Sequence, residues 1–279
     1  MADIHIILDS TASITNTYLK KYANLHIIPL NIIIDKSQWY EEQLTPDEMF
    51  KIVASGGGHP KTSQPAVGDF LAVIDPLLRA DKEIIIITLS GGLSGTAQGA
   101  RLAATMANSN KIQVIDSETT AVGMVKLAEA ALTMADKGKS AQAIVRYLQT
   151  QIRATHTMFI PDTLDYLHKG GRIGGAAALF GSILQIKPIL QLLDGRVAVL
   201  DKVRTMPKAI SRMLDELKRY NQLEYIGVVH CGALNQAEAL SRQIRELYPY
   251  TDISVSSIGS VLGAHLGPGV VGLIFQERI

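Results

Sequence analysis

The sequence predicts an α/β fold in two parts: an N-terminal domain with a parallel, doubly wound-like sheet and a C-terminal α/β domain with a mixed sheet. In the first half, apolar β-branched runs alternate with amphipathic runs, which is typical of strand–helix units in a parallel sheet. The run at residues 83–89 is strongly apolar, as central parallel strands are. In the second half, Asp194-Gly195 separates two apolar runs and predicts a tight antiparallel hairpin.

Apolar runs and helix-start signals define the elements of the first half. Thr45, Pro46 and Glu48 predict the start of a helix, because Thr45 can cap it, proline fits its first turn and Glu48 completes a capping box. A loop rich in glycine and proline is expected at residues 55–68. The expected strands are residues 5–9, 27–34, 83–89 and 112–115, and further helices follow a turn at 90–95 and fill 119–154.

The second half mixes hairpin and helix connections. The expected strands are residues 157–160, 186–193, 197–203, 225–229, 253–258 and 270–275, and the expected helices are 163–168, 205–220 and 235–247. Such connections predict a mixed sheet with helices on one side. We place the domain boundary between residues 157 and 158, so that the two domains span 1–157 and 158–279.

The composition narrows the classes of protein. The 279-residue chain has a formal net charge of +1, and its 5% aromatic residues do not interleave with basic ones, so we expect no nucleic-acid partner. Cys231 is the single cysteine, which precludes an internal disulfide and fits a reducing, cytoplasmic compartment. The N-terminus has no signal-peptide pattern. Neither HExxH nor CxxC spacing occurs, so we expect no metal and no cofactor.

Three polar turns follow expected parallel strands, at residues 9–11, 90–95 and 116–117. Ligands of open parallel sheets bind at these carboxyl ends. The turn at 90–95 is glycine-rich and leads into a helix, so its backbone N–H groups can approach and bind an anion. The alternative is a tight turn in which Ser94 or Thr96 only caps the helix.

This turn departs from two catalytic motifs. It lacks the Gly-Lys-Ser/Thr of a P-loop. A nucleophile elbow needs glycine two residues after its serine, where Thr96 stands here. A stand-alone serine hydrolase that uses Ser94 and His265, oriented by Asp9 or Asp116, is therefore disfavoured but stays an alternative.

Other polar residues lie in loops rich in glycine or proline. Prolines around Thr62 can hold its hydroxyl in place, or Thr62 can simply cap a turn. His265 lies among three glycines, and its imidazole can donate to a carboxylate or serve a structural role. Arg172, in a basic glycine-rich turn, and Arg204 can contact a phosphate or a partner, or remain solvated.

Taken in chain order, seven segments resemble the DegV family, the fatty-acid-binding component of bacterial fatty acid kinase. They are residues 9–12 (DSTA), 61–65 (KTSQP) with 68–70 (GDF), 93–96 (LSGT), 114–117 (VIDS), 164–173 (LDYLHKGGRI), 186–189 (IKPI) and 263–269 (GAHLGPG). The chain departs from the family pattern at Ala66 and at Gly91-Gly92, where the family often has serine. These departures change neighbouring residues of the two loops, and the hydroxyls of Thr62 and Ser94 are retained.

The resemblance implies a non-catalytic protein that holds a long-chain fatty acid between its two domains. On this basis Thr62 and Ser94 grip the carboxylate, and His265 lies beside it. The acyl chain lies in an apolar tunnel of the C-terminal domain. The apolar stretch at residues 176–193 is our candidate for part of the tunnel wall.

The resemblance also implies a separate kinase subunit. That subunit phosphorylates the bound carboxylate and gives an acyl-phosphate for phospholipid synthesis, and transient contact with a membrane surface is compatible with this role. Arg172 and Arg204 match basic positions associated with the partner or the phosphoryl group. A lipid sensor without a kinase partner is the remaining alternative.

Overall fold

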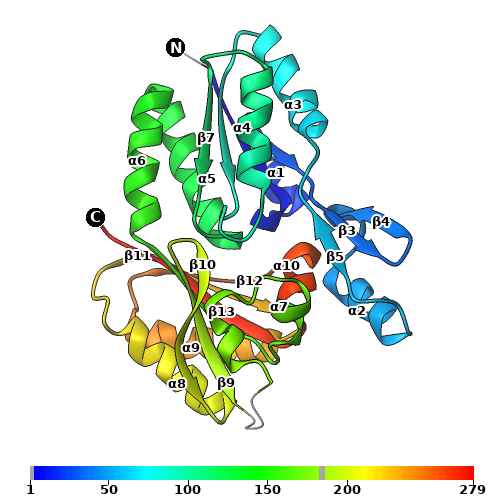
Figure 1. The fold of residues 1–279 in the computed structure, drawn as a ribbon. Helices are drawn as coiled ribbons and strands as arrows, with labels where there is room; N and C mark the ends of the chain where they lie inside the picture. The colour runs from blue at the N-terminus through cyan, green and yellow to red at the C-terminus, as the bar shows by residue number, and fades with distance from the viewer. Residues whose placement is uncertain (1–2, 182–185) are drawn as a thin grey trace.

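The computed structural model of the protein describes residues 3–181 and 186–279. Two sheets dominate the arrangement in Figure 1: a four-stranded sheet in the upper half and a six-stranded sheet in the lower half. A small three-stranded sheet projects to one side between them. In the described part of the chain, every helix is too short or too polar to cross a membrane.

The upper sheet is parallel and doubly wound, as predicted. Its order is β2-β1-β6-β7, and all of its pairs are parallel. The strands are β1 (Ile4–Asp9), β2 (Leu25–Ile28), β6 (Glu83–Thr88) and β7 (Ile112–Asp116). One face packs on α3 (Val67–Arg79) and α4 (Thr96–Met106), and the other on α5 (Ala121–Asp136) and α6 (Ala141–Arg153), with α1 (Asn16–Leu19) at its edge. Alternate isoleucines of β1 and β6 therefore enter two separate apolar clusters.

The single strand expected at residues 27–34 is wrong. The run divides at Pro29 and Leu30 into β2 and β3 (Asn31–Ile34), which belong to different sheets. A proline has no N–H to donate to a strand ladder, so the chain can leave the parallel sheet at this point. β3 pairs in antiparallel fashion with β4 (Ser37–Tyr40) and with β5 (Lys61–Ser63).

The loop expected at residues 55–68 is also partly wrong, because it contains β5. The register sets Thr62 opposite Ile32, so Thr62 is held by a sheet and not by a free loop. The helix start at Thr45 is confirmed: α2 (Pro46–Ala54) begins with a capping box in which the Thr45 hydroxyl accepts from the Glu48 N–H. A short 3-10 helix, Glu41–Gln43, precedes it.

The lower sheet is mixed, as predicted, with the order β10-β9-β8-β13-β11-β12. Its strands are β8 (Thr155–Ile160), β9 (Lys187–Leu193), β10 (Arg196–Val203), β11 (Leu223–Cys231), β12 (Asp252–Ser257) and β13 (Val270–Glu277). The β11–β12 pair is parallel, and the other pairs are antiparallel. The predicted hairpin turn is confirmed: Asp194 and Gly195 have φ of 49° and 71°, which fits a two-residue type I′ turn.

The two faces of the lower sheet have different coverings. Helices α8 (Met206–Leu217) and α9 (Leu234–Leu247) cover the lower face (Figure 1) and pack on an apolar cluster there. Shorter elements lie toward the upper sheet: α7 (Asp165–Lys169), a 3-10 helix (Gly174–Leu179) and α10 (Ser260–Leu266). The expectation of helices on one side is therefore correct only in part, because α8 and α9 cover one face and the shorter α7 and α10 lie on the other. The other face is available to build a site.

Candidate functional site

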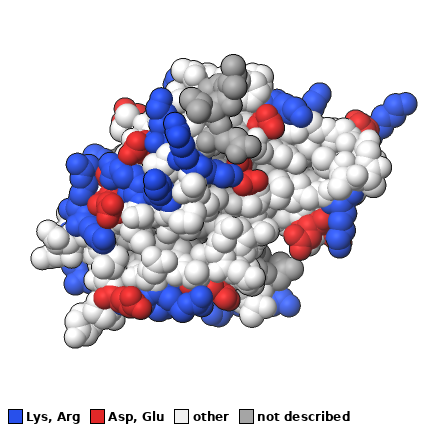
Figure 2. All heavy atoms as spheres, turned by 90° about the horizontal axis from the view of Figure 1, so that it is seen from below, with Lys and Arg blue, Asp and Glu red and all other residues white. Residues whose placement is uncertain are grey.

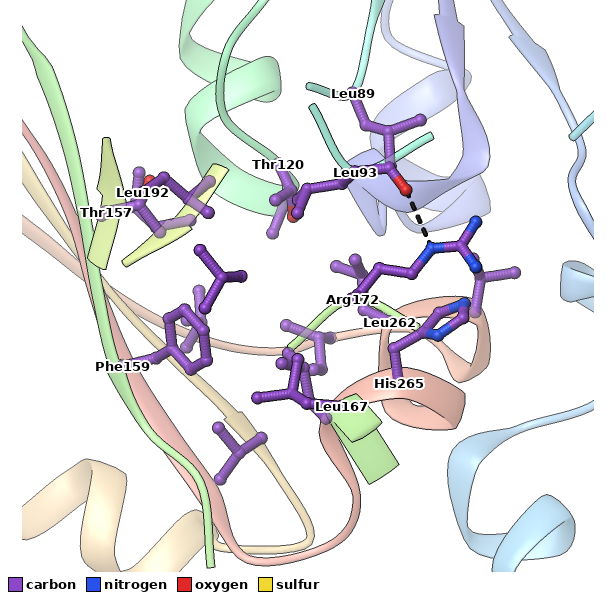
Figure 3. Close-up of a pocket in the computed structure, with 18 of the residues that line it drawn as sticks. Leu89, Leu93, Thr120, Thr157, Phe159, Leu167, Arg172, Leu192, Leu262 and His265 are labelled. Atoms are coloured by element: carbon purple, nitrogen blue, oxygen red, sulfur yellow. Dashed lines mark hydrogen bonds between the residues drawn. The ribbon is translucent and has the colours of Figure 1, made fainter. Parts of the chain in front are cut away.

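A cavity lies between the carboxyl edge of the upper sheet and the upper face of the lower sheet (Figure 3). It holds about 850 Å³ of empty space, part of it open to solvent. Its apolar wall consists of Leu30, Leu89, Leu93, Ala121, Met158, Phe159, Leu167, Leu192, Val197, Val229, Ile258, Val261, Leu262, Leu266, Val270 and Ile274. A wall of this kind suits an apolar ligand.

Polar groups from both halves of the chain meet at this cavity. Thr62 of β5 and His265 of α10 both line it, and the Thr62 Oγ1 and His265 Nε2 atoms are 2.7 Å apart. Ser94 lines the same cavity. The three residues implied by the resemblance as ligand-binding therefore border one space, although 203 residues separate Thr62 from His265.

His265 is a neutral imidazole at pH 7. Burial, with further contributions from Arg172 and His59, lowers the pKa of His265 to about 4. Its Nδ1 is buried without a hydrogen-bond partner among the described residues. A bare nitrogen is less costly to leave unpaired than an N–H, which assigns the proton to Nε2. Nε2–H then donates to Thr62, and the Thr62 hydroxyl proton is free to point into the cavity.

The loop that carries Ser94 is fixed by two carboxylates, the buried Asp9 and the half-buried Asp116. Asp9 accepts from the Leu89 N–H at 2.6 Å, and Asp116 accepts from the Gly91 N–H at 2.9 Å. A Cβ at Gly91 would meet the Asp116 carboxylate, so glycine is needed for this close approach. The three polar turns predicted at the strand ends are thus brought together, and Asp9 and Asp116 serve as anchors of the Ser94 loop.

The Ser94 hydroxyl has local partners that orient it. Its oxygen accepts from the Thr96 N–H at 3.3 Å and lies 2.8 Å from the Thr96 hydroxyl oxygen. When Thr96 supplies the donor, the Ser94 proton can point into the cavity. The capping alternative is wrong, because the N-cap residue of α4 is Gly95 and no side chain caps the helix. The Ser94 oxygen accepts from the Thr96 N–H, and its hydroxyl remains a donor.

Arg172 is the one charged residue in the described lining of the cavity, if His230 and His265 are neutral. Its Nε donates to the Leu93 carbonyl at 3.0 Å (Figure 3). Another guanidinium nitrogen donates to the Gly170 carbonyl at 2.7 Å. Within the described ranges no carboxylate pairs with it. The cavity therefore carries an uncompensated positive charge beside His265, and an anionic group would fit there.

Arg204 lies elsewhere. It is exposed, follows β10 and precedes α8, and it is absent from the cavity lining. Figure 2 shows many Lys and Arg side chains on the face of the molecule seen from below. The structure therefore separates the two arginines that the resemblance grouped together: Arg172 belongs to the cavity, and Arg204 to the surface.

The serine hydrolase alternative has no assembled triad in the described chain. His265 Nε2 bonds to Thr62 and its Nδ1 bonds to nothing. The Asp9 carboxylate accepts from Thr11 and from the Leu89 N–H, and Asp116 from two backbone N–H groups. A triad needs a base that is bonded to the nucleophile and to an orienting acid. The aspartates instead stabilise the turns.

The stretch at residues 176–193, expected to form part of the tunnel wall, contributes to the described cavity lining through Leu192. Residues 182–185 lie outside the described chain, and in the rest of the stretch Leu192 is the residue that lines the cavity. Ala176, Ile189 and Leu190 are buried in apolar clusters instead. The wall comes mainly from β8, β11, β13 and α10, whose apolar runs the sequence revealed but whose inward faces depend on how the two sheets stack.

The fold and the cavity define a class: an α/β protein in which a parallel sheet and a mixed sheet enclose an apolar ligand cavity with a cationic, hydroxyl-bearing end. Similarities to known proteins specify the family. Residues 3–278 match the family model described as an uncharacterised protein of the DegV family. The chain therefore belongs to the DegV family.

The chain matches known relatives over nearly their whole length. A DegV domain-containing protein of Listeria monocytogenes is 34% identical over 280 residues, which cover 99% of each chain. The solved structure of a DegV family protein of Thermus thermophilus, described by its fatty acid binding, has a TM-score of 0.92 at 28% identity and covers 99% of this chain and 100% of its own. That of DegV of Bacillus subtilis, described as a fatty acid binding protein, has a TM-score of 0.88 at 28% identity and covers 100% of both.

Proposed function

We propose that this protein binds a long-chain fatty acid and presents the carboxylate to a separate kinase subunit. One observation carries the proposal: an apolar cavity is bordered by Thr62, Ser94, His265 and Arg172 and by no acidic residue in its described lining. The fatty acid binding of related DegV proteins supports it. We also propose a two-domain division near residue 157, at the start of β8, because that strand belongs as a whole to the lower sheet. The two hydroxyls then come from the first domain and most of the apolar wall from the second.

The tail supplies most of the affinity in this proposal, and the head sets the orientation. Each methylene removed from water contributes about 0.8 kcal/mol, so about fourteen methylenes offer on the order of 11 kcal/mol before losses. A hydrogen bond to a carboxylate contributes about 1.5–3 kcal/mol. The carboxylate would be costly to bury alone, and the two hydroxyls with the Arg172 charge offset that cost. Neutral His265 adds a donor behind Thr62 without adding a charge.

The kinase step needs a carboxylate that is accessible from outside. One carboxylate oxygen attacks the γ-phosphorus of ATP held by the kinase subunit. The bond from phosphorus to the β,γ-bridging oxygen breaks, ADP leaves, and an acyl-phosphate for phospholipid synthesis results. In this scheme the protein has no catalytic residue of its own, and it supplies binding and orientation.

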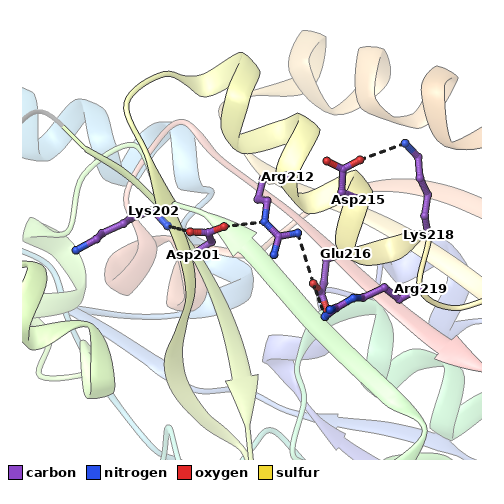
Figure 4. Close-up of polar contacts among 7 residues, drawn as sticks. All are labelled: Asp201, Lys202, Arg212, Asp215, Glu216, Lys218 and Arg219. Atoms are coloured by element: carbon purple, nitrogen blue, oxygen red, sulfur yellow. Dashed lines mark hydrogen bonds and ion pairs between the residues drawn. The ribbon is translucent and has the colours of Figure 1, made fainter.

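Arg204 is our candidate for contact with the kinase subunit. Cations on and just after α8, the helix that follows Arg204 in the chain, are paired: Arg212 pairs with Asp201 at 2.6 Å, Arg219 with Glu216 at 2.9 Å, and Lys218 with Asp215 (Figure 4). The side chains of Lys202, Arg204 and Lys208 have no ion pair with any described residue. Such free surface cations favour encounter with an acidic partner surface.

The binding proposal predicts that lipid extracted from the purified protein is a long-chain fatty acid, as identified by mass spectrometry. The Thr62→Ala/Ser94→Ala double variant should lose two hydrogen bonds to the carboxylate and bind hexadecanoic acid on the order of a hundredfold more weakly. Ser63→Ala is the matched control, because Ser63 is the next residue on β5 and does not line the cavity. Wild-type affinity in the double variant would contradict the assigned grip.

The kinase proposal predicts that Arg204→Ala lowers formation of acyl-phosphate several-fold with the kinase subunit and ATP, while hexadecanoic acid binding is unchanged. Arg172→Ala should weaken both, because Arg172 lines the cavity and supports the Ser94 loop through Leu93. Exposed Arg101 on α4 is the control position. Equal loss of binding and phosphorylation in Arg204→Ala would contradict a role of Arg204 in docking the kinase subunit. Tight binding by wild type with no phosphorylation would instead fit a lipid sensor.

A further inference from the structure

Glu41 is a buried carboxylate that the proposed grip does not use. It opens the 3-10 helix after β4 and is 8% exposed, which is rare for glutamate without an ionic partner. Its Oε1 accepts from the Val261 N–H at 2.9 Å, and its Oε2 has no partner among the described residues. Because 220 residues separate Glu41 from Val261, this bond joins distant parts of the chain at the start of α10.

A second contact holds the same end of α10. The Gly259 N–H donates to the Ser13 hydroxyl oxygen at 2.9 Å. A Cβ at Gly259 would lie only 2.1 Å from Glu41 Oε1, so the carboxylate fits against the helix start only because glycine stands there. Glu41 and Ser13 together replace the cap that α10 lacks, since its own N-cap residue, Gly259, has no side chain.

The other end of α10 carries the polar grip. The helix has seven residues, too few to be stable without contacts from the rest of the protein. His265 lies in its last turn, bonds to Thr62 and borders the cavity. Val261, the residue that Glu41 holds, lines the cavity as well. A short helix moves as one body, so the position of its first turn fixes the position of the imidazole.

We infer that Glu41 is a positioning residue that holds α10, and through it His265, in the geometry that binds the carboxylate. This inference rests on the proposed function and assigns it a residue outside the cavity lining. The contact with α10 requires a hydrogen-bond acceptor at Oε1 and does not require a charge. Oε1 can accept from the Val261 N–H whether or not the carboxyl group is protonated. Glutamine retains that acceptor, and alanine removes it.

The test is a double-mutant cycle on the dissociation constant of hexadecanoic acid. Glu41→Ala should weaken binding about tenfold, and Glu41→Gln should restore it to within about twofold of wild type. Glu41→Ala/His265→Ala should lose less affinity than the product of the two single effects, because Glu41 acts largely through that imidazole. Glu41→Ala/Ser94→Ala is the matched control and should lose the product of the two single effects. Multiplicative loss with His265→Ala, or no loss in Glu41→Ala, would overturn the inference.

Two further measurements separate the causes of failure. Nitrogen NMR of the His265 imidazole in the ligand-free protein should change in Glu41→Ala and not in Glu41→Gln. This readout needs no fatty acid, so it tests the positioning role even if wild type does not bind hexadecanoic acid and the proposed function fails. Ser13→Ala removes the other contact and should give the same pattern to a smaller degree, which covers the case in which Glu41→Ala does not fold. An unchanged His265 spectrum in both variants would refute the positioning role.

Discussion

Two carboxyl groups, those of Asp9 and Glu41, are buried near the boundary between the upper and lower halves of the molecule. Burial raises the pKa of Asp9 to about 6, although Thr11 and the Leu89 N–H lower it. Burial also raises the pKa of Glu41 to about 7, with a further increase from Asp9 and decreases from Ser10 and the Val261 N–H. Each group is thus retained at a cost in stability at neutral pH. The Asp9 carboxylate in turn holds the start of the Ser94 loop through its hydrogen bond from the Leu89 N–H.

The Glu41 carboxyl predicts a pH-dependent difference between wild type and Glu41→Gln. Its folded pKa exceeds its ordinary value of 4.5, so the folded state binds more protons between these values, and wild type loses stability as pH rises through about 7. Glutamine does not ionise, so between pH 5.5 and pH 8 the variant should gain roughly 2 kcal/mol relative to wild type. Urea unfolding at pH 5.5 and pH 8 measures this gain.

The control for that measurement is Glu42→Gln, which changes the exposed neighbour of Glu41. Its stability relative to wild type should stay nearly constant between the two pH values. The same constancy in Glu41→Gln would mean that Glu41 titrates near its ordinary pKa. His265, whose pKa is lowered by burial, acts in the opposite sense below pH 6.5, but it is present in all three proteins and cancels in the comparison.

At the scale of elements, the position of His265, which the proposed function places beside the carboxylate, depends on how closely α7 meets α10. Gly170 ends α7 with φ of −77°, which any residue can adopt. A Cβ there would nevertheless lie 2.3 Å from the His265 Nδ1 atom. The need for glycine at this position is therefore one of space and not of backbone conformation.

Gly170→Ala should displace His265 and weaken hexadecanoic acid binding about tenfold, because overpacking at a tight contact costs about 1–3 kcal/mol. Gly68→Ala is the matched control: Gly68 lies in α3 with no heavy atom within 4 Å of an added Cβ. A titration of both variants with hexadecanoic acid checks this. Equal affinities in the two variants would show that α7 gives way without moving the imidazole.

At the scale of the whole molecule, local signals predicted most of the fold. The parallel sheet, the mixed sheet and the Asp194-Gly195 hairpin follow from runs and turns that act over a few residues. The small third sheet does not. β5 has three polar residues, and its partner β3 follows a proline, so neither has a clear period, and both depend on pairing across distant parts of the chain.

The polar residues of the candidate site were also predicted in part. Turn chemistry and the family resemblance identified Ser94, Thr62 and His265 as candidates, and all three border the cavity. The part played by Glu41 could not be predicted, because nothing near it in the sequence indicates a contact 220 residues away. The cavity wall could not be predicted either. The stacking of the two sheets decides which alternate residues of β11 and β13 face the cavity.

The polar end and the apolar wall of the cavity come from different elements. The hydroxyls and cation that face an acid lie on β5, the Ser94 loop and the turn after α7, whereas Val229, Val270 and Ile274 come from strands of the lower sheet. On the proposed function, a larger or smaller side chain on those strands changes the length of lipid that fits and leaves the recognition of its acid untouched. On the same proposal, proteins with this fold can bind lipids of different length while they retain one arrangement of polar groups for the acid.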